Sequence, residues 1–110
     1  MASSPKYRVE WAIVAQQDLQ TLVEFIAADD PVTAAKVLDQ IESRAETLQQ
    51  MPGRGRIVPE LAVVNIHSYR ELIISPWRLV YRIAEPVVYV LAVLDGRRNI
   101  EDILLDRLVR

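Results

Sequence analysis

The sequence contains no cysteine and only one histidine, His67. Without thiols the chain can form neither disulfides nor thiolate nucleophiles, and a single imidazole leaves little for a zinc or iron site. The absence of cysteine fits the reducing cytoplasm, where we expect this protein to reside. The sequence therefore indicates no metal and no cofactor.

Long hydrophobic runs are also missing. The longest uninterrupted apolar stretch, Val87–Leu94, is far shorter than the ~20 residues that a membrane-spanning helix needs. Residues 1–11 lack the apolar segment of a signal peptide. With 110 residues, of which 51% are hydrophobic, the chain predicts one domain over residues 1–110 with a modest core and no membrane association.

Lysine is scarce, and the positive charge comes almost entirely from arginine. Residues 1–53 carry four basic against eight acidic side chains, whereas residues 54–110 carry nine arginines against seven acidic side chains. The net charge of −2 argues against a general nucleic-acid binder. Arginine favours fixed, bidentate contacts with carboxylates or phosphates, so the arginine-rich half is where we expect recognition.

The first half of the chain reads as a strand followed by two helices. Residues 6–11 alternate polar and apolar side chains, as in a strand. Residues 12–28 place apolar side chains three and four apart, and residues 31–51 repeat that pattern, so both predict helices with one buried face. Asp30 caps the second helix and Pro31 fits its first position. So short a connection predicts an antiparallel helix hairpin.

The second half predicts a sheet and a last helix. After a loop over residues 52–61, strands are expected at His67–Ser75, Trp77–Ala84 and Val87–Leu94, followed by a short amphipathic helix at Ile100–Val109. The element order β-α-α-β-β-β-α predicts an α+β fold. It comprises an N-terminal strand, an antiparallel helix hairpin, a three-stranded antiparallel sheet and a short C-terminal helix.

Alternation along Trp77–Ala84 assigns its side chains to two faces. The large apolar residues Trp77, Leu79, Tyr81 and Ile83 should lie beneath the hairpin, and Arg78, Val80 and Arg82 should point to the opposite, open face. Both arginines are then solvated, so Arg78→Ala and Arg82→Ala should leave folding intact. Tyr81 and Tyr89 read as core aromatics with a polar tip.

Seven short pieces of the sequence, spread over nearly its whole length, resemble in order the ParE/RelE superfamily, the toxins of bacterial type II toxin–antitoxin systems. They are the first strand running into Asp18-Leu19, Asp30-Pro31 followed by Ala34-Ala35, the helix end from Leu48 through Pro52-Gly53, Gly55-Arg56 and Pro59-Glu60-Leu61, Tyr69-Arg70-Glu71-Leu72, the run 77–83, the run 90–93, and Gly96-Arg97-Arg98.

The resemblance leaves two branches to compare. RelE-like members are ribosome-dependent ribonucleases with sheet arginines and an acid/base group near the C-terminus; in this sequence Arg78, Arg82, Arg97, Arg98 and His67 would take those roles. Residues 100–110 contain no tyrosine or histidine, however. His67 begins a strand and reads as an exposed edge residue. The pieces 69–72 and 96–99 look more like the ParE branch, which includes plasmid stabilisation proteins.

The ParE-like resemblance implies a non-enzymatic toxin that arrests growth by binding DNA gyrase. Alternatives are a RelE-type mRNA endoribonuclease, or a degenerate member that only binds its antitoxin. The implied partner is a ParD-like antitoxin, of ribbon-helix-helix type, in a higher toxin–antitoxin assembly. We expect partner or target contacts at Arg70, Arg78, Val80, Arg82, Arg97 and Arg98.

Overall fold

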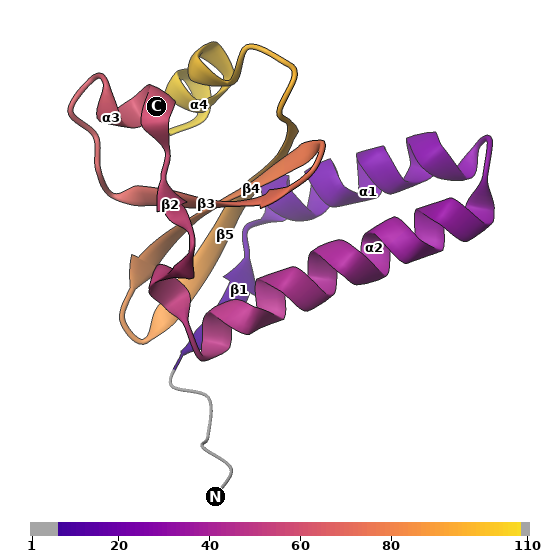
Figure 1. Cartoon of the computed structure of the whole chain (residues 1–110), viewed down its shortest axis with the longest axis horizontal. Helices are drawn as coiled ribbons and strands as arrows, with labels where there is room; N and C mark the ends of the chain where they lie inside the picture. Colours follow the sequence, from indigo (N-terminus) through magenta and orange to yellow (C-terminus); the bar gives the residue numbers. More distant parts are fainter. Residues whose placement is uncertain (1–6, 109–110) are drawn as a thin grey trace, which may run out of the picture.

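The computed structural model describes residues 7–108, except for the side chain of Leu108 (Figure 1). Lys6 and Val109, which the sequence predicts at the start of the first strand and the end of the last helix, lie outside the described residues. The α+β class and the order of the predicted elements are confirmed.

One five-stranded mixed sheet forms the centre of the molecule, in the order β1-β5-β4-β3-β2. Strands β3 (Tyr69–Ile74), β4 (Trp77–Ala84) and β5 (Val87–Asp95) form the predicted antiparallel meander. The N-terminal strand β1 (Arg8–Trp11) adds to this meander in parallel with β5, and the short β2 (Arg56–Ile57) pairs antiparallel with β3. The apolar β5 is thus an interior strand of the sheet.

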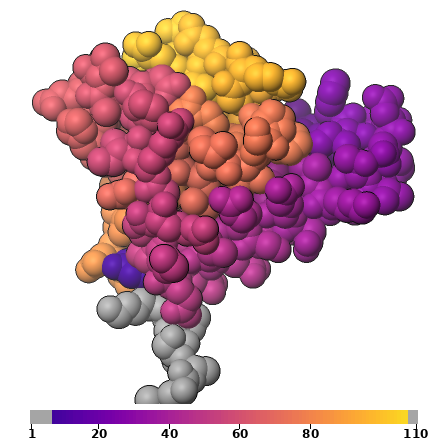
Figure 2. Space-filling view, viewed as in Figure 1, coloured from indigo at the N-terminus to yellow at the C-terminus, as the bar shows by residue number. Residues whose placement is uncertain are grey.

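The predicted helix hairpin consists of α1 (Ile13–Ala27) and α2 (Pro31–Glu46). The carboxylate of Asp30 accepts a hydrogen bond from the Thr33 backbone N–H at 3.1 Å, which confirms the predicted cap. The α-helical part of α2 ends five residues before the predicted end at Met51, and a 3₁₀ turn, η1 (Thr47–Gln49), continues it. Figure 2 shows the connected end of the hairpin extending beyond the sheet.

The stretch predicted as loop contains three short elements. They are the 3₁₀ turn η2 (Pro52–Arg54), strand β2, and the single-turn helix α3 (Pro59–Ala62). Each 3₁₀ or helical turn begins at a proline, whose fixed φ suits the first helical position. Elements of two to four residues have no measurable hydrophobic period, so the sequence pattern could not predict them.

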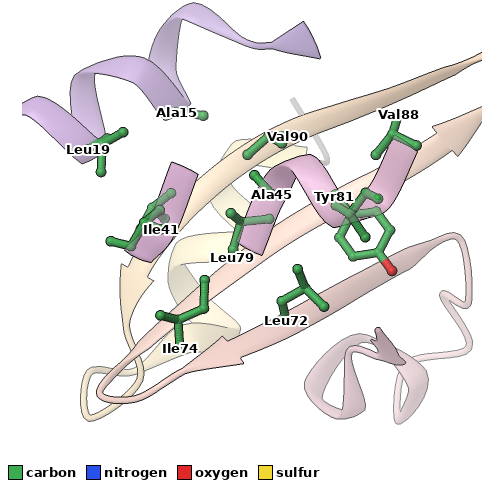
Figure 3. Packing of buried hydrophobic residues seen from close by; sticks show 12 residues of the cluster. Ala15, Leu19, Ile41, Ala45, Leu72, Ile74, Leu79, Tyr81, Val88 and Val90 are labelled. Atoms are coloured by element: carbon green, nitrogen blue, oxygen red, sulfur yellow. The ribbon is translucent and has the colours of Figure 1, made fainter. Parts of the chain in front are cut away.

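The main core lies between the hairpin and one face of the sheet (Figure 3). As predicted, Leu79 and Tyr81 of β4 are fully buried there, with Trp77 and Ile83 packed beside them. The hairpin and the 3₁₀ turn η1 that continues it contribute the small and branched side chains that face them. These residues are Ala15, Leu19, Ile41, Ala45 and Leu48.

A second, smaller core covers the opposite face of the sheet. Helix α4 (Ile100–Leu108) inserts Ile100 and Leu104 against Val80, Ala92 and Leu94 of the sheet. Helix α3 and the residue before it complete this layer with Leu61 and Val58. Both faces of β5 are therefore covered. Within residues 7–108, no helix combines the length and apolarity needed to cross a membrane.

Candidate functional site

Arg78 lies at the centre of a buried ion network on the α3–α4 side of the sheet. Its Nη1 and Nη2 atoms donate to the two carboxylate oxygens of Glu60 at 2.6 Å each. Its Nε donates to Glu71 Oε1 at 2.6 Å, and Nη2 also donates to Glu71 Oε2 at 2.9 Å. Arg56 donates to Glu71 Oε2 from the other side at 2.7 Å. Four charged side chains from β2, β3, β4 and α3 thus neutralise one another.

The expectation that Arg78 is solvated is wrong. Arg78 is only 7% exposed and the side chain of Glu71 is fully buried, because α3 and α4 cover this part of the sheet face. Hydrogen bonds to Glu60 and then Glu71 raise the pKa of the Arg78 guanidinium, and the bond from Arg78 lowers the pKa of Glu60. Four of the five N–H groups of the guanidinium donate to carboxylates, so Arg78 cannot offer a bidentate contact to a phosphate without losing these bonds.

Two further predicted contact residues serve the fold. Val80 is fully buried in the second core, so the expectation of an open sheet face fails there too. Arg70 is half-buried and donates to the carbonyl oxygen of Gly55 at 2.7 Å and to that of Gly53 at 3.4 Å. Arg70 therefore holds the loop between η2 and β2 against the sheet.

Arg82 is the one β4 arginine that stays exposed. It pairs with Tyr69 on β3 and with Tyr89 on β5, so an arginine lies between two tyrosines across three neighbouring strands. Alternation places Arg82 on the face opposite the hairpin, beyond the part that α4 covers. Tyr89 is half-buried beside Arg82 and belongs to neither core cluster, so the prediction that it is a core aromatic is wrong.

Arg97 and Arg98 are both exposed in the connection between β5 and α4. Arg97 donates through Nε to Asp95 Oδ1 at 2.9 Å and through Nη2 to Asp95 Oδ2 at 2.7 Å. These side-chain bonds, with a further bond from the Arg97 backbone, lower the pKa of Asp95 to about 2. In the described part of the chain, the Arg98 guanidinium makes no hydrogen bond or ion pair.

The predicted nuclease residues are not brought together. Asp95, just before Arg97, pairs with Trp77 at one end of β4, whereas Arg82 lies five residues further along that strand, roughly 17 Å away at ~3.3 Å per residue. His67 precedes β3 near the Arg82 end, and its Nε2 contacts Asn65 Oδ1 at 3.1 Å. The structure therefore divides the set between opposite ends of the sheet.

Asp18 and Arg107 form a contact that the sequence did not predict. The Arg107 guanidinium donates to both oxygens of Asp18, at 2.7 and 2.8 Å, and the Val93 backbone N–H donates to Asp18 Oδ2 at 3.0 Å. This carboxylate joins α1, β5 and α4. Asp18 and Arg107 are separated by most of the chain, so no local sequence pattern indicates that they form an ion pair. Only the tertiary structure shows it.

Comparison with known proteins gives consistent matches. The sequence profile described as "ParE toxin of type II toxin-antitoxin system, parDE" matches residues 9–100. Among curated proteins, the candidate toxin Y4kP of Sinorhizobium fredii is 29% identical over 99 residues, which cover 88% of this chain and 96% of that protein.

Two solved structures share the fold. The chromosomal ParDE system of P. aeruginosa has a TM-score of 0.67 at 20% identity, covering 82% of this chain and 96% of that chain. The toxin–antitoxin complex RelBE2 of Mycobacterium tuberculosis has a TM-score of 0.57 at 25% identity, covering 84% and 94%. Both matches span nearly all of the solved chain and more than four fifths of this one.

Proposed function

This chain belongs to the ParE toxin family of type II toxin–antitoxin systems, and from that premise we propose that it arrests growth by binding DNA gyrase. The match of the family profile over residues 9–100 carries the proposal. We further propose that it acts in the cytoplasm and that a ParD-like antitoxin of ribbon-helix-helix type neutralises it within a larger assembly. The two solved relatives are named as toxin–antitoxin systems, which supports such a partner.

The ion pairs and positions of the arginines favour a binding mechanism over a catalytic one. RNA cleavage needs a base for the 2′-hydroxyl, a donor for the leaving oxygen and cations close to one phosphate. Arg78 forms ion pairs with Glu60 and Glu71, and Arg97 forms one with Asp95. Arg82 lies at the other end of the sheet from Arg97. These positions favour a protein that docks on its target without cutting RNA.

Arg82 is the arginine we propose for the gyrase contact. It is exposed, carries a charge that no side chain within residues 7–108 neutralises, and lies between Tyr69 and Tyr89. Arginine and tyrosine are the residue types that most often dominate the free energy of protein–protein contacts. Arg97 and Arg98 form a second exposed cationic position, at the opposite end of the sheet.

A DNA supercoiling assay with purified gyrase tests this function. The wild-type chain should inhibit supercoiling and cause cleaved DNA to accumulate, and its expression without antitoxin should stop growth with double-strand breaks. Arg82→Ala should lose most of the inhibition. Lys36→Ala is the matched control, because it removes an exposed cation on the outer side of α2. Undisturbed gyrase at micromolar toxin would contradict the proposal.

Ribosome-dependent cleavage of mRNA is a second candidate, and one observation favours it. Tyr69 and Tyr89 place phenol groups on either side of Arg82, and His67 lies two residues before Tyr69. Phenol and imidazole groups can act as acid/base catalysts, and α4 contains neither tyrosine nor histidine. Cleavage of mRNA on ribosomes, with intact DNA and loss of activity in Tyr69→Phe or Tyr89→Phe, would establish this function instead. A protein that arrests no growth at all would be a member that only binds its antitoxin.

A further inference from the structure

The helix hairpin carries a groove lined by side chains of α1, of α2 and of Trp11, the last residue of β1. The groove encloses about 570 Å³. Figure 1 shows the two helices side by side and antiparallel, with β1 at the end away from their connection. The lining is apolar and acidic, and none of the lysine, arginine or histidine side chains in the described part of the chain belongs to it.

The antiparallel arrangement places the two carboxylates of the groove at its opposite ends. Gln16 on α1 and Glu42 on α2 are each thirteen residues from Asp29, the middle of the connection, so they stand at about the same level of the hairpin. Glu24 lies eight residues beyond Gln16 on α1, which corresponds to roughly 12 Å along the helix axis. Glu24 and Glu42 are therefore two separate anionic positions and not one acidic cluster.

The part of the groove between these two positions is apolar. Leu19 and Val23 of α1 and Leu38 of α2 line it, and all three also pack in or against the main core. The half-buried ring of Trp11 adds an aromatic surface, which attracts cations. An apolar floor between two carboxylates suits a ligand with a methylene chain and a positive charge at each end.

Polar side chains also follow one stripe of α1 along the groove. Gln16, Gln20 and Glu24 are spaced four residues apart, or about 6 Å per step. Gln16 Nε2 donates to the Trp11 carbonyl at 3.0 Å, and Gln20 Nε2 donates to Glu24 Oε1 at 2.9 Å. Both amide oxygens, and the carboxylate of Glu42, make no hydrogen bond within the described chain. The groove thus offers oxygen acceptors at each step of its length.

From the two separated carboxylates, the apolar floor between them and the acceptors beside it, we propose that the groove binds a linear aliphatic polyamine. Its end ammonium groups pair with Glu24 and Glu42, and its methylene groups lie against Leu38 and its neighbours. A triamine of the length of spermidine spans roughly 11 Å between its end nitrogens when extended, which matches the separation of the carboxylates. This inference is independent of the proposed function, because it involves none of the arginines assigned to the target.

Isothermal titration of the full-length chain with spermidine tests this site. We expect one spermidine to bind per chain, and binding should weaken at high salt because screening reduces the attraction. Glu24→Gln and Glu42→Gln should each raise Kd at least fivefold, since each removes one ion pair. Both residues are exposed, so neither change should disturb folding. Putrescine, which is too short to reach both carboxylates, should bind at least tenfold more weakly than spermidine.

Glu46→Gln and Glu101→Gln are the matched controls, since each removes an exposed carboxylate that does not line the groove. Their Kd values should stay within twofold of wild type. Mg²⁺ carries charge without a methylene chain and should compete only weakly with spermidine. Equal Kd values for all four variants, or equally strong competition by Mg²⁺, would show that spermidine is a diffuse counter-ion and would overturn the site. A lack of binding at millimolar spermidine would overturn it as well, and either result would leave gyrase inhibition untouched.

Discussion

Arg78 illustrates how one buried arginine can serve a fold. Its guanidinium satisfies Glu60 and Glu71 together, and Arg56 completes the neutralisation of Glu71. A buried ion pair adds little net stability over apolar packing, but removing one partner leaves an uncompensated charge at high cost. Arg82, four residues along the same face of β4, has no such partner in the described chain, so the two arginines differ in burial and in ion pairing.

Replacing each of these arginines with alanine should change the free energy of unfolding by different amounts. Arg78→Ala should lower the free energy of unfolding by about 3–5 kcal/mol, because it leaves the buried Glu71 carboxylate with only Arg56. Arg82→Ala should change it by less than about 0.5 kcal/mol. Urea denaturation followed by circular dichroism measures both. The double variant Arg78→Ala/Glu71→Gln should recover part of the loss, and no recovery would show that the cost does not arise from the unpaired carboxylate.

At the scale of elements, the segment from Pro52 to Gly55 is held by Tyr81 of the main core as well as by Arg70. The Tyr81 hydroxyl donates to the Pro52 carbonyl at 2.7 Å and accepts from the Gly55 N–H at 2.9 Å. Figure 3 shows the Tyr81 oxygen at the edge of the aliphatic cluster. The close approach leaves no room for a side chain at position 55, where a Cβ would lie 2.6 Å from both the Glu71 carbonyl oxygen and the Tyr81 hydroxyl.

A pair of glycine substitutions tests this packing. Gly55→Ala should lower the free energy of unfolding by about 1–3 kcal/mol, because the added methyl group must displace β3 or the Tyr81 ring. Gly53→Ala, two residues earlier, should be nearly neutral, since nothing lies within 4 Å of its Cβ. Thermal unfolding of the two variants gives the comparison. Equal unfolding midpoints would mean that the loop is not held against Tyr81 in solution.

Across the whole molecule, the sheet is covered on both faces by layers of unequal size. The α1–α2 hairpin forms the larger layer, and α3 with α4 forms the smaller one. Ion pairs help to attach this smaller layer: Glu60 of α3 binds Arg78, and Arg107 of α4 binds Asp18. The smaller layer thus depends on ionised carboxylates as well as on Ile100 and Leu104.

The Glu60 contact should make stability depend on pH. Its bond from Arg78 lowers the pKa in the folded protein. The stabilisation is therefore complete above the unfolded pKa near ~4.3 and is lost as the pH falls through the lower folded value. Glu60→Gln should be less stable than wild type at pH 7, and the gap should narrow towards pH 3. Urea midpoints across this range test it.

Glu46→Gln is the control for this titration. Glu46 is exposed at the end of α2 and makes no side-chain hydrogen bond or ion pair in the described chain, so its substitution should not change the pH profile. A constant gap between wild type and Glu60→Gln down to pH 3 would show that the Arg78 bond does not depend on the charge of Glu60.

The sequence by itself determined the features that depend on local patterns. Hydrophobic periodicity predicted both hairpin helices and the three meander strands, and alternation along β4 put Leu79 and Tyr81 beneath the hairpin. Short motifs in order predicted the toxin family. These signals succeed because they repeat within a few residues, where backbone geometry alone decides which side chains share a face.

Tertiary structure alone decided the surroundings of the arginines. Alternation correctly placed Arg78, Val80 and Arg82 on one face, but it could not tell that α3 and α4 cover the first two and leave Arg82 exposed. The partners Glu60 and Asp18 come from distant segments, and β2 and α3 are too short for a pattern. Whether an arginine is buried in an ion pair or exposed for contact with a partner depends on which elements pack over it. The residues of those elements are spread along the whole chain.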